Sequence, residues 1–460
     1  MALKASIPKG TRDFLPTEVA KRNYVTGVIR TQFERYGYLP IQTPAMEKSS
    51  TLKGKYGQEG DRLMFNILNS GVKVKKADIN AFENNAFSQF ISSISEKSLR
   101  YDLTVPFARF VVQHYNEINL PFRRYQIQTV WRGDRPQRGR FQEFTQCDAD
   151  VVGAVSPLLE AECMQLFDDI FDDLSLKGST IRINHRGILA GIANYLDEPD
   201  RIVDFTVALD KLDKIGAEGV YNELRGKGFD EAALKRLNPL LEISGNVLTQ
   251  LDELEQILAL QPEALEGIAQ LRKTLGFLNP FKVSKLAFDL TLARGLHYYT
   301  GIIFEVAPPK SVSMGSIGAG GRYDDLTAVF GLKDVHGLGI SFGLDRLCIV
   351  LEDLNLFPTS LSQSVDIVVL NFGDEFMQDL IPYFTKWRDM GIRINCYPTA
   401  HKLKKQMQFA NCTNAPFVMF YGNDEQQKGV ISIKNMREGK NNFIKLKDFS
   451  KKSIIKILKK

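Results

Sequence analysis

The stretch that most constrains the fold is residues 122–150, FRRYQIQTVWRGDRPQRGRFQEFTQCDAD. In residues 124–131, aromatic, aliphatic and hydroxyl side chains fall at every second position, which is the period of a β-strand. A second run, residues 141–150, begins with Phe141 and Phe144 and then turns polar. A proline and two glycines lie between the two runs and favour a loop. This stretch therefore predicts an antiparallel hairpin with a long loop at its tip.

The predicted loop is rich in arginine, and the second strand is rich in side chains that accept hydrogen bonds. The arginines are Arg132, Arg135, Arg138 and Arg140, and the acceptors are Glu143, Gln146, Asp148 and Asp150. A guanidinium fork can hold phosphate oxygens from two directions, whereas carboxylates and an amide suit a cationic or N–H-bearing ligand. The alternative is an ordinary solvated hairpin, which accounts for the basic loop but not for the acidic strand.

Length and composition set limits on the class of protein. At 460 residues the chain is too long for one compact core, so two or three domains are expected. It has no apolar run long enough to cross a membrane, and its first residues, MALKASIPKGTRDF, lack the apolar stretch of a signal peptide. The five cysteines are scattered and form no CxxC pair, which gives no indication of a disulfide framework or a zinc site. These features predict a cytoplasmic protein without a membrane segment.

The net charge of +5 is unevenly distributed along the chain. Residues 361–460 contain 17 Lys and Arg against 9 Asp and Glu, a net charge of +8, so the first 360 residues carry −3. A basic C-terminal domain suggests contact with a nucleic acid at that end. A solvated lysine-rich tail is the alternative, because the last residues, KDFSKKSIIKILKK, supply much of the excess.

Residues 99–110, LRYDLTVPFARF, form a second cluster of candidate functional residues. Apolar residues alternate from Leu99 through Leu103, which predicts a strand with Asp102 and Thr104 on one face. A carboxylate beside a hydroxyl suits a substrate ammonium group. The alternative is a solvated Asp–Thr pair on an edge strand.

The third cluster lies in residues 286–306, LAFDLTLARGLHYYTGIIFEV, where apolar strands flank a polar centre. Arg294 precedes a glycine, which lets its guanidinium enter a cleft at little steric cost. Tyr298 and Tyr299 combine apolar faces with hydroxyls that can read a ring nitrogen. The alternative is a structural pair of tyrosines in a sheet.

Two glycine-rich segments follow this cluster. Residues 315–325, GSIGAGGRYDD, predict a turn that carries Tyr323. Residues 337–351, GLGISFGLDRLCIVL, predict a strand and then a helix that carries Arg346 near its start.

The clusters, composition and periodicity divide the chain into five parts. These are a first core segment (1–185), a mainly helical insertion (186–280), a second core segment (281–354), a linker (355–364) and a small α/β domain (365–460). In the last part, short apolar runs alternate with helical patterns, which predicts a separate mixed sheet.

Several of these motifs resemble those of class II aminoacyl-tRNA synthetases. WRGDRPQRGRFQEF resembles motif 2 of that class, GLDRL resembles motif 3, and RGLHYYTG is a distinctive signature of the histidyl-tRNA synthetase family. The resemblance covers nearly the whole chain in the family's order. It implies an α/β fold with an α+β catalytic core, in which helices flank an antiparallel sheet. A helical insertion and a C-terminal anticodon-binding domain with a mixed sheet complete the implied architecture.

The resemblance also implies the reaction and its partners. Histidine and ATP would form histidyl-adenylate, and the histidyl group would pass to the 3′ end of tRNA(His), with Mg2+ bridging the ATP phosphates. A helix and strand at residues 18–43 resemble motif 1, which in the family builds the interface of a homodimer.

The resemblance further implies a role for each candidate residue. For ATP and the adenylation step the residues are Arg132, Arg140, Arg294 and Arg346, of which Arg132 and Arg294 are the catalytic pair. For the histidine ammonium group they are Asp102, Thr104 and Gln146. For the imidazole ring and its pocket they are Asp150, Tyr298, Tyr299 and Tyr323.

The chain departs from the usual family pattern at three places. His297 and Asp150 stand where many bacterial members have Asp and Glu, respectively, and residues 71–97 form an insertion with no assigned role. Three alternatives stay open: the catalytically silent regulatory subunit of ATP phosphoribosyltransferase, another class II synthetase such as the threonyl or prolyl enzyme, and a non-enzymatic tRNA-binding module. The regulatory subunit typically lacks the C-terminal domain and departs from the RGLxYYTG signature. This chain has both the C-terminal domain and the signature.

Overall fold

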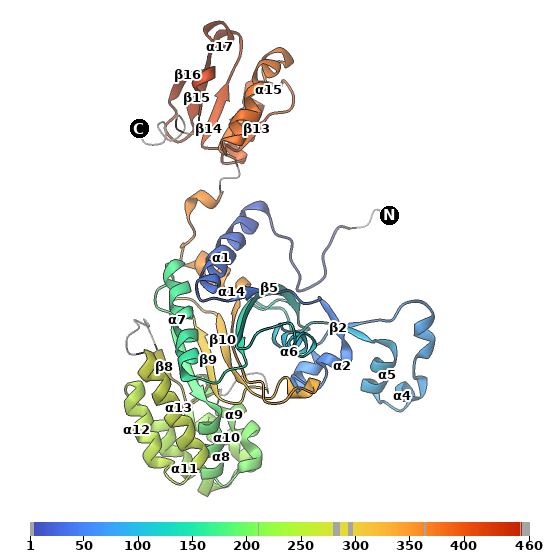
Figure 1. Ribbon diagram of the computed structural model, residues 1–460, viewed down its shortest axis with the longest axis vertical. Helices are drawn as coiled ribbons and strands as arrows, with labels where there is room; N and C mark the ends of the chain where they lie inside the picture. Colours follow the sequence, from blue (N-terminus) through green and yellow to red (C-terminus); the bar gives the residue numbers. More distant parts are fainter. Residues whose placement is uncertain are drawn as a thin grey trace. The chain divides into compact units, whose positions relative to one another are not determined.

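The computed structural model describes residues 4–209, 211–278, 286–292, 298–362, 365–450 and 452 (Figure 1). The chain divides into two compact units. The first comprises Met1–Asp13 and Arg22–Leu356, and the second comprises Phe14–Lys21 and Phe357–Lys460. Within the described residues, no helix combines the length and the hydropathy that crossing a membrane requires.

An eight-stranded sheet forms the centre of the first unit. In spatial order its strands are β1 (Leu39–Pro40), β5 (Phe122–Trp131), β6 (Glu143–Val152), β11 (Gly337–Gly343), β10 (Gly318–Tyr323), β9 (Ile302–Ala307), β7 (Thr180–His185) and β8 (Leu286–Phe288). All neighbours pair antiparallel except β1 with β5 and β7 with β8, which are parallel. The predicted antiparallel core is therefore confirmed, with one parallel pair at each edge.

The predicted hairpin of residues 122–150 is also confirmed. Strands β5 and β6 pair in a register that places Gln128 opposite Gln146 and Arg124 opposite Asp150. Because side chains alternate across a strand, these four residues share one face of the sheet.

Helices α1 (Pro16–Arg35) and α7 (Pro157–Asp173) cover the other face. Phe33 of α1 and Phe167 of α7 both pack on Phe342 of β11, with ring centroids 6.1 and 4.9 Å away. A buried ion pair between Glu160 of α7 and Arg322 of β10 ties the same helix to the sheet. This face therefore forms the main core, which leaves the opposite face for polar chemistry.

Two predictions of local structure are wrong. A strand was expected to run through Asp102, but strand β4 (Lys97–Leu99) ends before it. Thr104 instead begins helix α6 (Thr104–Gln113). Pro106 lies in the first turn of that helix, where a missing N–H costs nothing. The turn expected at residues 315–325 is largely strand β10, because its glycines lie in the sheet rather than at a bend.

The helical insertion is confirmed as a group of six helices beside β7 and β8 (Figure 1). They are α8 (Arg186–Tyr195), α9 (Ile202–Leu209), α10 (Leu212–Gly226), α11 (Glu231–Glu242), α12 (Val247–Ile257) and α13 (Pro262–Leu278). His185, which begins this region, accepts a hydrogen bond from the Gly187 N–H and contacts Gln270. Its role is therefore structural.

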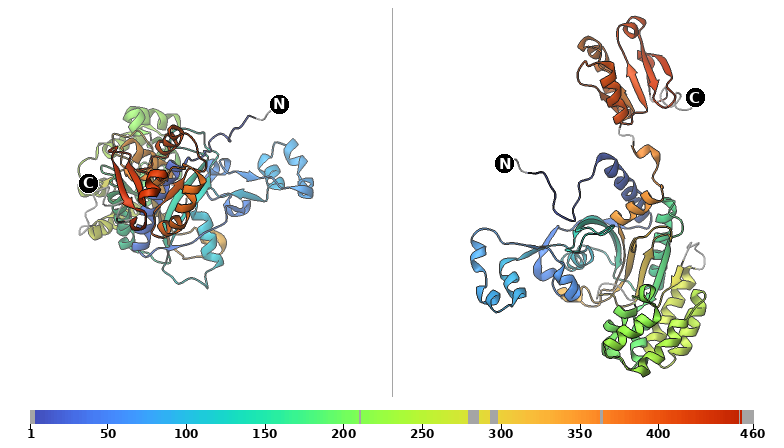
Figure 2. Two further views of the ribbon diagram at one scale, coloured as in Figure 1. Left: turned by 90° about the horizontal axis from the view of Figure 1, so that it is seen from above. Right: turned by 180° about the vertical axis from the view of Figure 1, so that it is seen from behind.

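A small lobe extends from the first unit between β3 (Asn66–Ile67) and β4, as Figure 2 shows from two sides. It contains a 3-10 helix (Gly71–Lys76), α4 (Ile79–Glu83) and α5 (Phe87–Ile94), and it corresponds to the insertion noted at residues 71–97. A three-stranded sheet, β2 (Met46–Lys48), β4 and β3, lies at its base together with the short helices α2 (Ser49–Leu52) and α3 (Gly57–Arg62).

The second unit contains a mixed sheet, as the sequence predicts, and this sheet has five strands. The strand order is β13 (Ile394–Cys396), β12 (Ile367–Val369), β14 (Phe417–Phe420), β15 (Val430–Asn435) and β16 (Asn441–Lys445). Strands β13, β12 and β14 are parallel to one another, whereas β15 pairs antiparallel with both β14 and β16. Helices α15 (Asp374–Asp389), α16 (Leu403–Cys412) and α17 (Asn423–Lys428) accompany the sheet.

The packing around β11 allows a test of the main core. Replacing Phe342 by Ala removes a ring that contacts three other phenylalanines and leaves a cavity, so we expect a loss of about 3–5 kcal/mol in the free energy of unfolding of the first unit. Leu260→Ala, at a position 89% exposed in the same unit, should cost less than about 0.5 kcal/mol. Urea denaturation would measure both, and equal losses would contradict this assignment of the core.

Candidate active site

The polar face of the sheet borders a cavity of about 720 Å3. The hairpin loop, the segment before β10 and the start of helix α14 (Leu344–Asp353) form its walls. Eight of the eleven candidate residues line it: Asp102, Thr104, Arg132, Arg140, Gln146, Tyr298, Tyr299 and Arg346. The structure therefore brings together, in one cavity, residues separated by up to 244 positions in the sequence.

Arg132, at the end of β5, is held in place from two sides. Its Nε donates to the Tyr101 carbonyl oxygen at 3.0 Å, and its guanidinium lies over the Tyr101 ring at 4.3 Å from the centroid. It also lies 5.3 Å from the centroid of the Phe144 ring. These contacts fix the plane of the guanidinium and leave its terminal nitrogens to bind a ligand.

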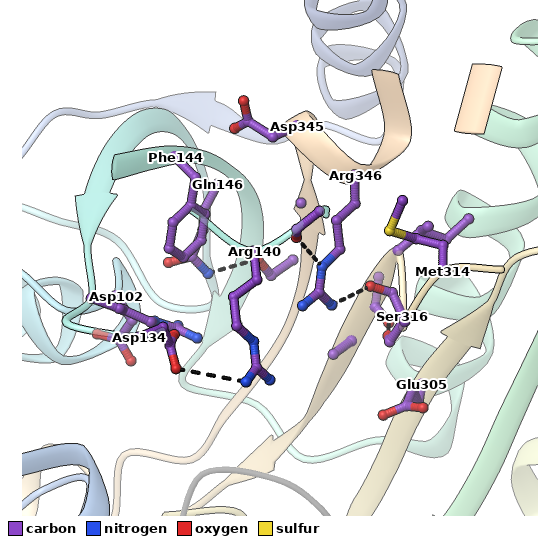
Figure 3. Close-up of a pocket in the computed structure, with 18 of the residues that line it drawn as sticks. Asp102, Asp134, Arg140, Phe144, Gln146, Glu305, Met314, Ser316, Asp345 and Arg346 are labelled. Carbon is purple, nitrogen blue, oxygen red and sulfur yellow. Dashed lines mark hydrogen bonds and ion pairs between the residues drawn. The ribbon is translucent and has the colours of Figure 1, made fainter. Parts of the chain in front are cut away.

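Arg140 and Arg346 extend into the same part of the cavity from the loop and from α14 (Figure 3). Arg346 donates to the carbonyl oxygens of Gly139 and Ser316, each at 2.7 Å. Burial lowers the pKa of Arg346, and the nearby positive charges of Arg140 and Arg132 lower it further. Such a concentration of positive charge is favourable when an anion such as a polyphosphate occupies the space between the three side chains.

Asp102 anchors the acidic end of the cavity. Its carboxylate accepts hydrogen bonds from the hydroxyl of Tyr56 at 2.9 Å and from the hydroxyl of Tyr298 at 3.1 Å. It also accepts one from the Val105 backbone N–H at 3.1 Å. Burial raises the pKa of Asp102, an effect that these hydrogen bonds and Arg132 oppose. A bound ammonium group would favour the ionised form in the same way.

The middle of the floor is a row of polar groups on β6 and β11. Gln146 donates from Nε2 to the Ser341 hydroxyl at 2.9 Å, and the Ser341 hydroxyl in turn faces Asp148. Burial raises the pKa of Asp148 to about 7. The Oε1 atom of Gln146 and the Oδ1 atom of Asp148 are buried and accept no hydrogen bond within the described residues. A cavity ligand that donates hydrogen bonds would satisfy the amide oxygen of Gln146.

Asp150 and Tyr323 do not line the cavity but lie buried behind it. The Tyr323 hydroxyl donates to Asp150 Oδ1 at 2.7 Å, and Arg124 Nη2 lies 2.6 Å from Asp150 Oδ2. Burial raises the pKa of Asp150, and the positive charge of Arg124 opposes this shift. An ionised carboxylate has about four lone-pair positions, so Asp150 keeps the capacity to accept a further hydrogen bond.

Glycines on the neighbouring strands provide the space for these side chains. A Cβ atom on Gly339 would lie 2.1 Å from Asp150 Oδ1, and one on Gly337 would lie 2.0 Å from the Tyr323 ring. Any larger residue at either position would displace the acid or the tyrosine. The glycines of β11 are therefore part of how the site is built.

Two residues singled out in the sequence, Arg294 and His297, lie outside the described residues. Among the residues that sequence reasoning missed, Tyr56, Arg124 and Ser341 interact with site residues through their side chains. Arg124 could have been found from the hairpin register, since it stands opposite Asp150. Tyr56 lies in a polar, glycine-dotted segment that gives no such signal.

Among the residues that the structure describes, no cluster of three or more His, Cys, Asp or Glu side chains could by itself hold a metal ion. The cavity instead has carboxylates on its walls, including Glu305 of β9, whose negative charge reaches Arg346. Such a site suits a Mg2+ ion that arrives with phosphate oxygens and needs only one or two protein ligands.

The raised pKa of Asp148 gives a testable pH dependence. A carboxyl group whose pKa rises from about 3.9 when unfolded to about 7 when folded destabilises the folded state progressively as the pH increases between those values. We expect Asp148→Asn to raise the free energy of unfolding relative to the wild type, and this gain to grow by about 1 kcal/mol per pH unit between pH 5 and pH 7.

Urea denaturation at several pH values would measure this gain. Asp200→Asn, at an exposed position, serves as the control and should show a constant difference from the wild type. A pH-independent effect of Asp148→Asn would show that Asp148 is ionised throughout this range.

Comparisons with known proteins agree with this geometry. The histidyl-tRNA synthetase family model matches residues 89–347, and an anticodon-binding-domain model matches residues 365–456. A histidine–tRNA ligase from Christiangramia forsetii is 53% identical over 95% of this chain and 97% of its own length. One from Flavobacterium johnsoniae is 49% identical over 95% of this chain and 97% of its own length.

Among solved structures, the crystal structure of histidyl-tRNA synthetase from Nostoc sp. PCC 7120 superimposes with a TM-score of 0.82. It is 28% identical to this chain, and the match covers 100% of both chains.

Proposed function

This chain belongs to the histidyl-tRNA synthetase family, and we propose on that basis that it joins histidine to tRNA(His) with the consumption of ATP. In the first step, the histidine carboxylate attacks the α-phosphorus of ATP, which gives histidyl-adenylate and releases pyrophosphate. In the second step, the histidyl group passes to the ribose at the 3′ end of the tRNA. The cavity beside β6 and β11 is the site of the first step.

The observation that carries this proposal is the separation of charge within one cavity. Arg132, Arg140 and Arg346 lie at one end, and Asp102 lies at the other with Gln146 nearby. An amino acid that is being adenylated requires this polarity, because its ammonium group and the polyphosphate have opposite charges and are joined through the reacting carboxylate.

The acidic end would bind histidine. Asp102, Thr104 and Gln146 would hold the ammonium group, whose three N–H donors match their carboxylate, hydroxyl and amide oxygens. Tyr299 lines the cavity and Asp150 lies behind its wall, so the imidazole would insert between them for the two residues to bind its nitrogens. One of these nitrogens donates and one accepts in the neutral ring. Tyr298 and Tyr323 would support this pocket through their hydrogen bonds to Asp102 and Asp150.

The basic end would bind ATP and stabilise the transition state. Arg132 would contact the α-phosphate, where negative charge develops as the carboxylate attacks, and Arg346 would contact the γ-phosphate. By family resemblance, Arg294 would help Arg132 to stabilise the developing charge, and Arg140 would bind further phosphate oxygens. The protein would accelerate the reaction by positioning and by charge stabilisation, without a covalent intermediate.

Class II synthetases that use ATP generally need Mg2+. When bound, Mg2+ neutralises charge on the β- and γ-phosphates and favours the departure of pyrophosphate. Glu305 is the cavity carboxylate that would help to hold it, because it faces the Arg346 end.

Several features beyond the site follow from the family. The second unit would bind the anticodon arm of the tRNA, and the exposed side chains of Lys402, Lys404 and Lys405 would contact its phosphates. The protein would act in the cytoplasm as a homodimer, with α1 and β1 at the interface. The five-part division of the chain given by the sequence remains a proposal.

Three observations favour an active enzyme over the alternatives. Relatives about half identical over nearly the whole chain are histidine–tRNA ligases, and the anticodon-binding-domain match at residues 365–456 covers the part that the regulatory subunit typically lacks. The described cavity also keeps Arg132, Arg140, Arg346 and Asp102 at its walls. A silent paralogue or a simple tRNA-binding module would have no need to keep them.

The experiment that tests the function is ATP–pyrophosphate exchange without tRNA, with each amino acid tried separately. We expect exchange with histidine alone. Exchange with another amino acid would contradict the assigned pocket, and no exchange from folded protein would indicate a regulatory paralogue.

Two arginines of the same loop test the role of Arg132. Arg132→Ala should lower the rate of histidine-dependent exchange by about 100-fold to 1,000-fold, because it removes a charge aimed at the reacting phosphate. Arg135→Ala is the control, since Arg135 lies in the same loop but is exposed and does not line the cavity. It should change the rate by less than about threefold. Equal losses in both variants would mean that overall loop charge, rather than the placement of Arg132, drives the reaction.

A further inference from the structure

The N-terminal segment 8–13 contacts the hairpin loop and the start of α14, both of which form walls of the cavity. The backbone N–H of Gln142 donates to the Gly10 carbonyl oxygen at 2.8 Å. The carbonyl oxygen of the same Gln142 accepts from the Arg132 N–H at 2.9 Å. The segment is therefore connected to Arg132 through a single residue.

Arg12, within this segment, makes two further contacts. Its guanidinium lies over the Phe141 ring, 3.4 Å from the centroid, and its Nη2 forms an ion pair with Asp345. Phe141 follows Arg140 in the loop, and Asp345 precedes Arg346 in α14. One side chain thus contacts the neighbours of two cavity arginines that come from different parts of the chain.

The charge of Asp345 does not by itself require Arg12. Arg22 of α1 lies 2.5 Å from the same carboxylate oxygen, and the Thr145 backbone N–H donates to the other oxygen at 2.9 Å. Asp345 is buried, but these two groups already compensate its charge. Arg12 therefore links the hairpin loop to helix α14 and is not needed as a counter-charge for Asp345.

Resting on the proposed function, we propose that Arg12 is a positioning residue for ATP. It clamps the end of the hairpin loop to the start of α14 and so fixes the relative positions of Arg132, Arg140 and Arg346. Arginine suits this task because its planar guanidinium can stack on a ring with one face while its edge pairs with a carboxylate.

Steady-state ATP–pyrophosphate exchange separates positioning from general stability. Arg12→Ala should raise the KM for ATP about tenfold and change the KM for histidine by less than about twofold, because only the ATP end loses its clamp. Arg12→Lys keeps the charge but not the flat contact with Phe141, so it should recover only part of the affinity for ATP. If lysine restores the KM for ATP fully, the clamp is electrostatic and the stacking role of Arg12 is wrong.

A matched control is Arg123→Ala, which removes a partly buried ion pair with Glu162 (2.7 Å) elsewhere in the same unit. Its side chain is 25% exposed, against 29% for Arg12. This variant should leave the KM for ATP unchanged, with thermal melting used to compare stabilities. A similar rise in the KM for ATP in Arg12→Ala and Arg123→Ala would overturn the proposal. So would a rise in the KM for histidine in Arg12→Ala that equals the rise in its KM for ATP.

The outcomes distinguish this inference from the proposed function. Absence of histidine-dependent exchange in the wild type would contradict the function itself, whereas normal exchange together with an unchanged KM for ATP in Arg12→Ala would contradict only the clamp. If Arg12→Ala does not yield folded protein, Arg12→Gln supplies the same comparison, because it keeps the stem of the side chain over Phe141. A combined Arg12→Ala and Phe141→Leu variant should raise the KM for ATP no more than Arg12→Ala alone, since both changes break one contact.

Discussion

The pairing of β6 with β11 is the constraint on which the rest of the site depends. Their antiparallel register places Gly339 opposite Asp150 and Ser341 opposite Asp148, and the alternation of side chains then separates two environments. One face is apolar and is buried under α1 and α7, while the other collects acids, amides and hydroxyls beside the cavity. A shift of one residue in this register would exchange the two faces, so the core and the chemistry are specified together.

The polar face also explains why so much charge can be buried. Asp102, Asp148 and Asp150 are all buried at the site; Arg124 pairs with Asp150 and its charge also reaches Asp148, while the charge of Arg132 reaches Asp102. Burial of these carboxylates carries a desolvation cost, which raises their pKa values. A cationic substrate reduces this cost when it binds, and a polyanion does the same for the arginines at the other end. The charge distribution of the cavity thus suits an ammonium group at one end and a polyphosphate at the other.

Local patterns in the sequence predicted the hairpin, the order of elements and eight of the residues that line the cavity, because period-two strands and paired charges are visible without tertiary structure. The prediction of a strand through Asp102 was wrong. It relied on the alternation of Leu99, Tyr101 and Leu103 and overlooked Pro106, which marks the start of a helix. The glycines of residues 315–325 suggested a turn. They lie in a strand because Gly321 makes room for Tyr299 from a distant segment, a contact that no local pattern can reveal.

The most direct test of this account is a crystal structure with a non-hydrolysable histidyl-adenylate analogue. The account predicts the ammonium group at Asp102 and Gln146, the imidazole between Tyr299 and Asp150, and the phosphate at Arg132. An analogue bound with its ends reversed, or outside the cavity beside β6 and β11, would contradict it.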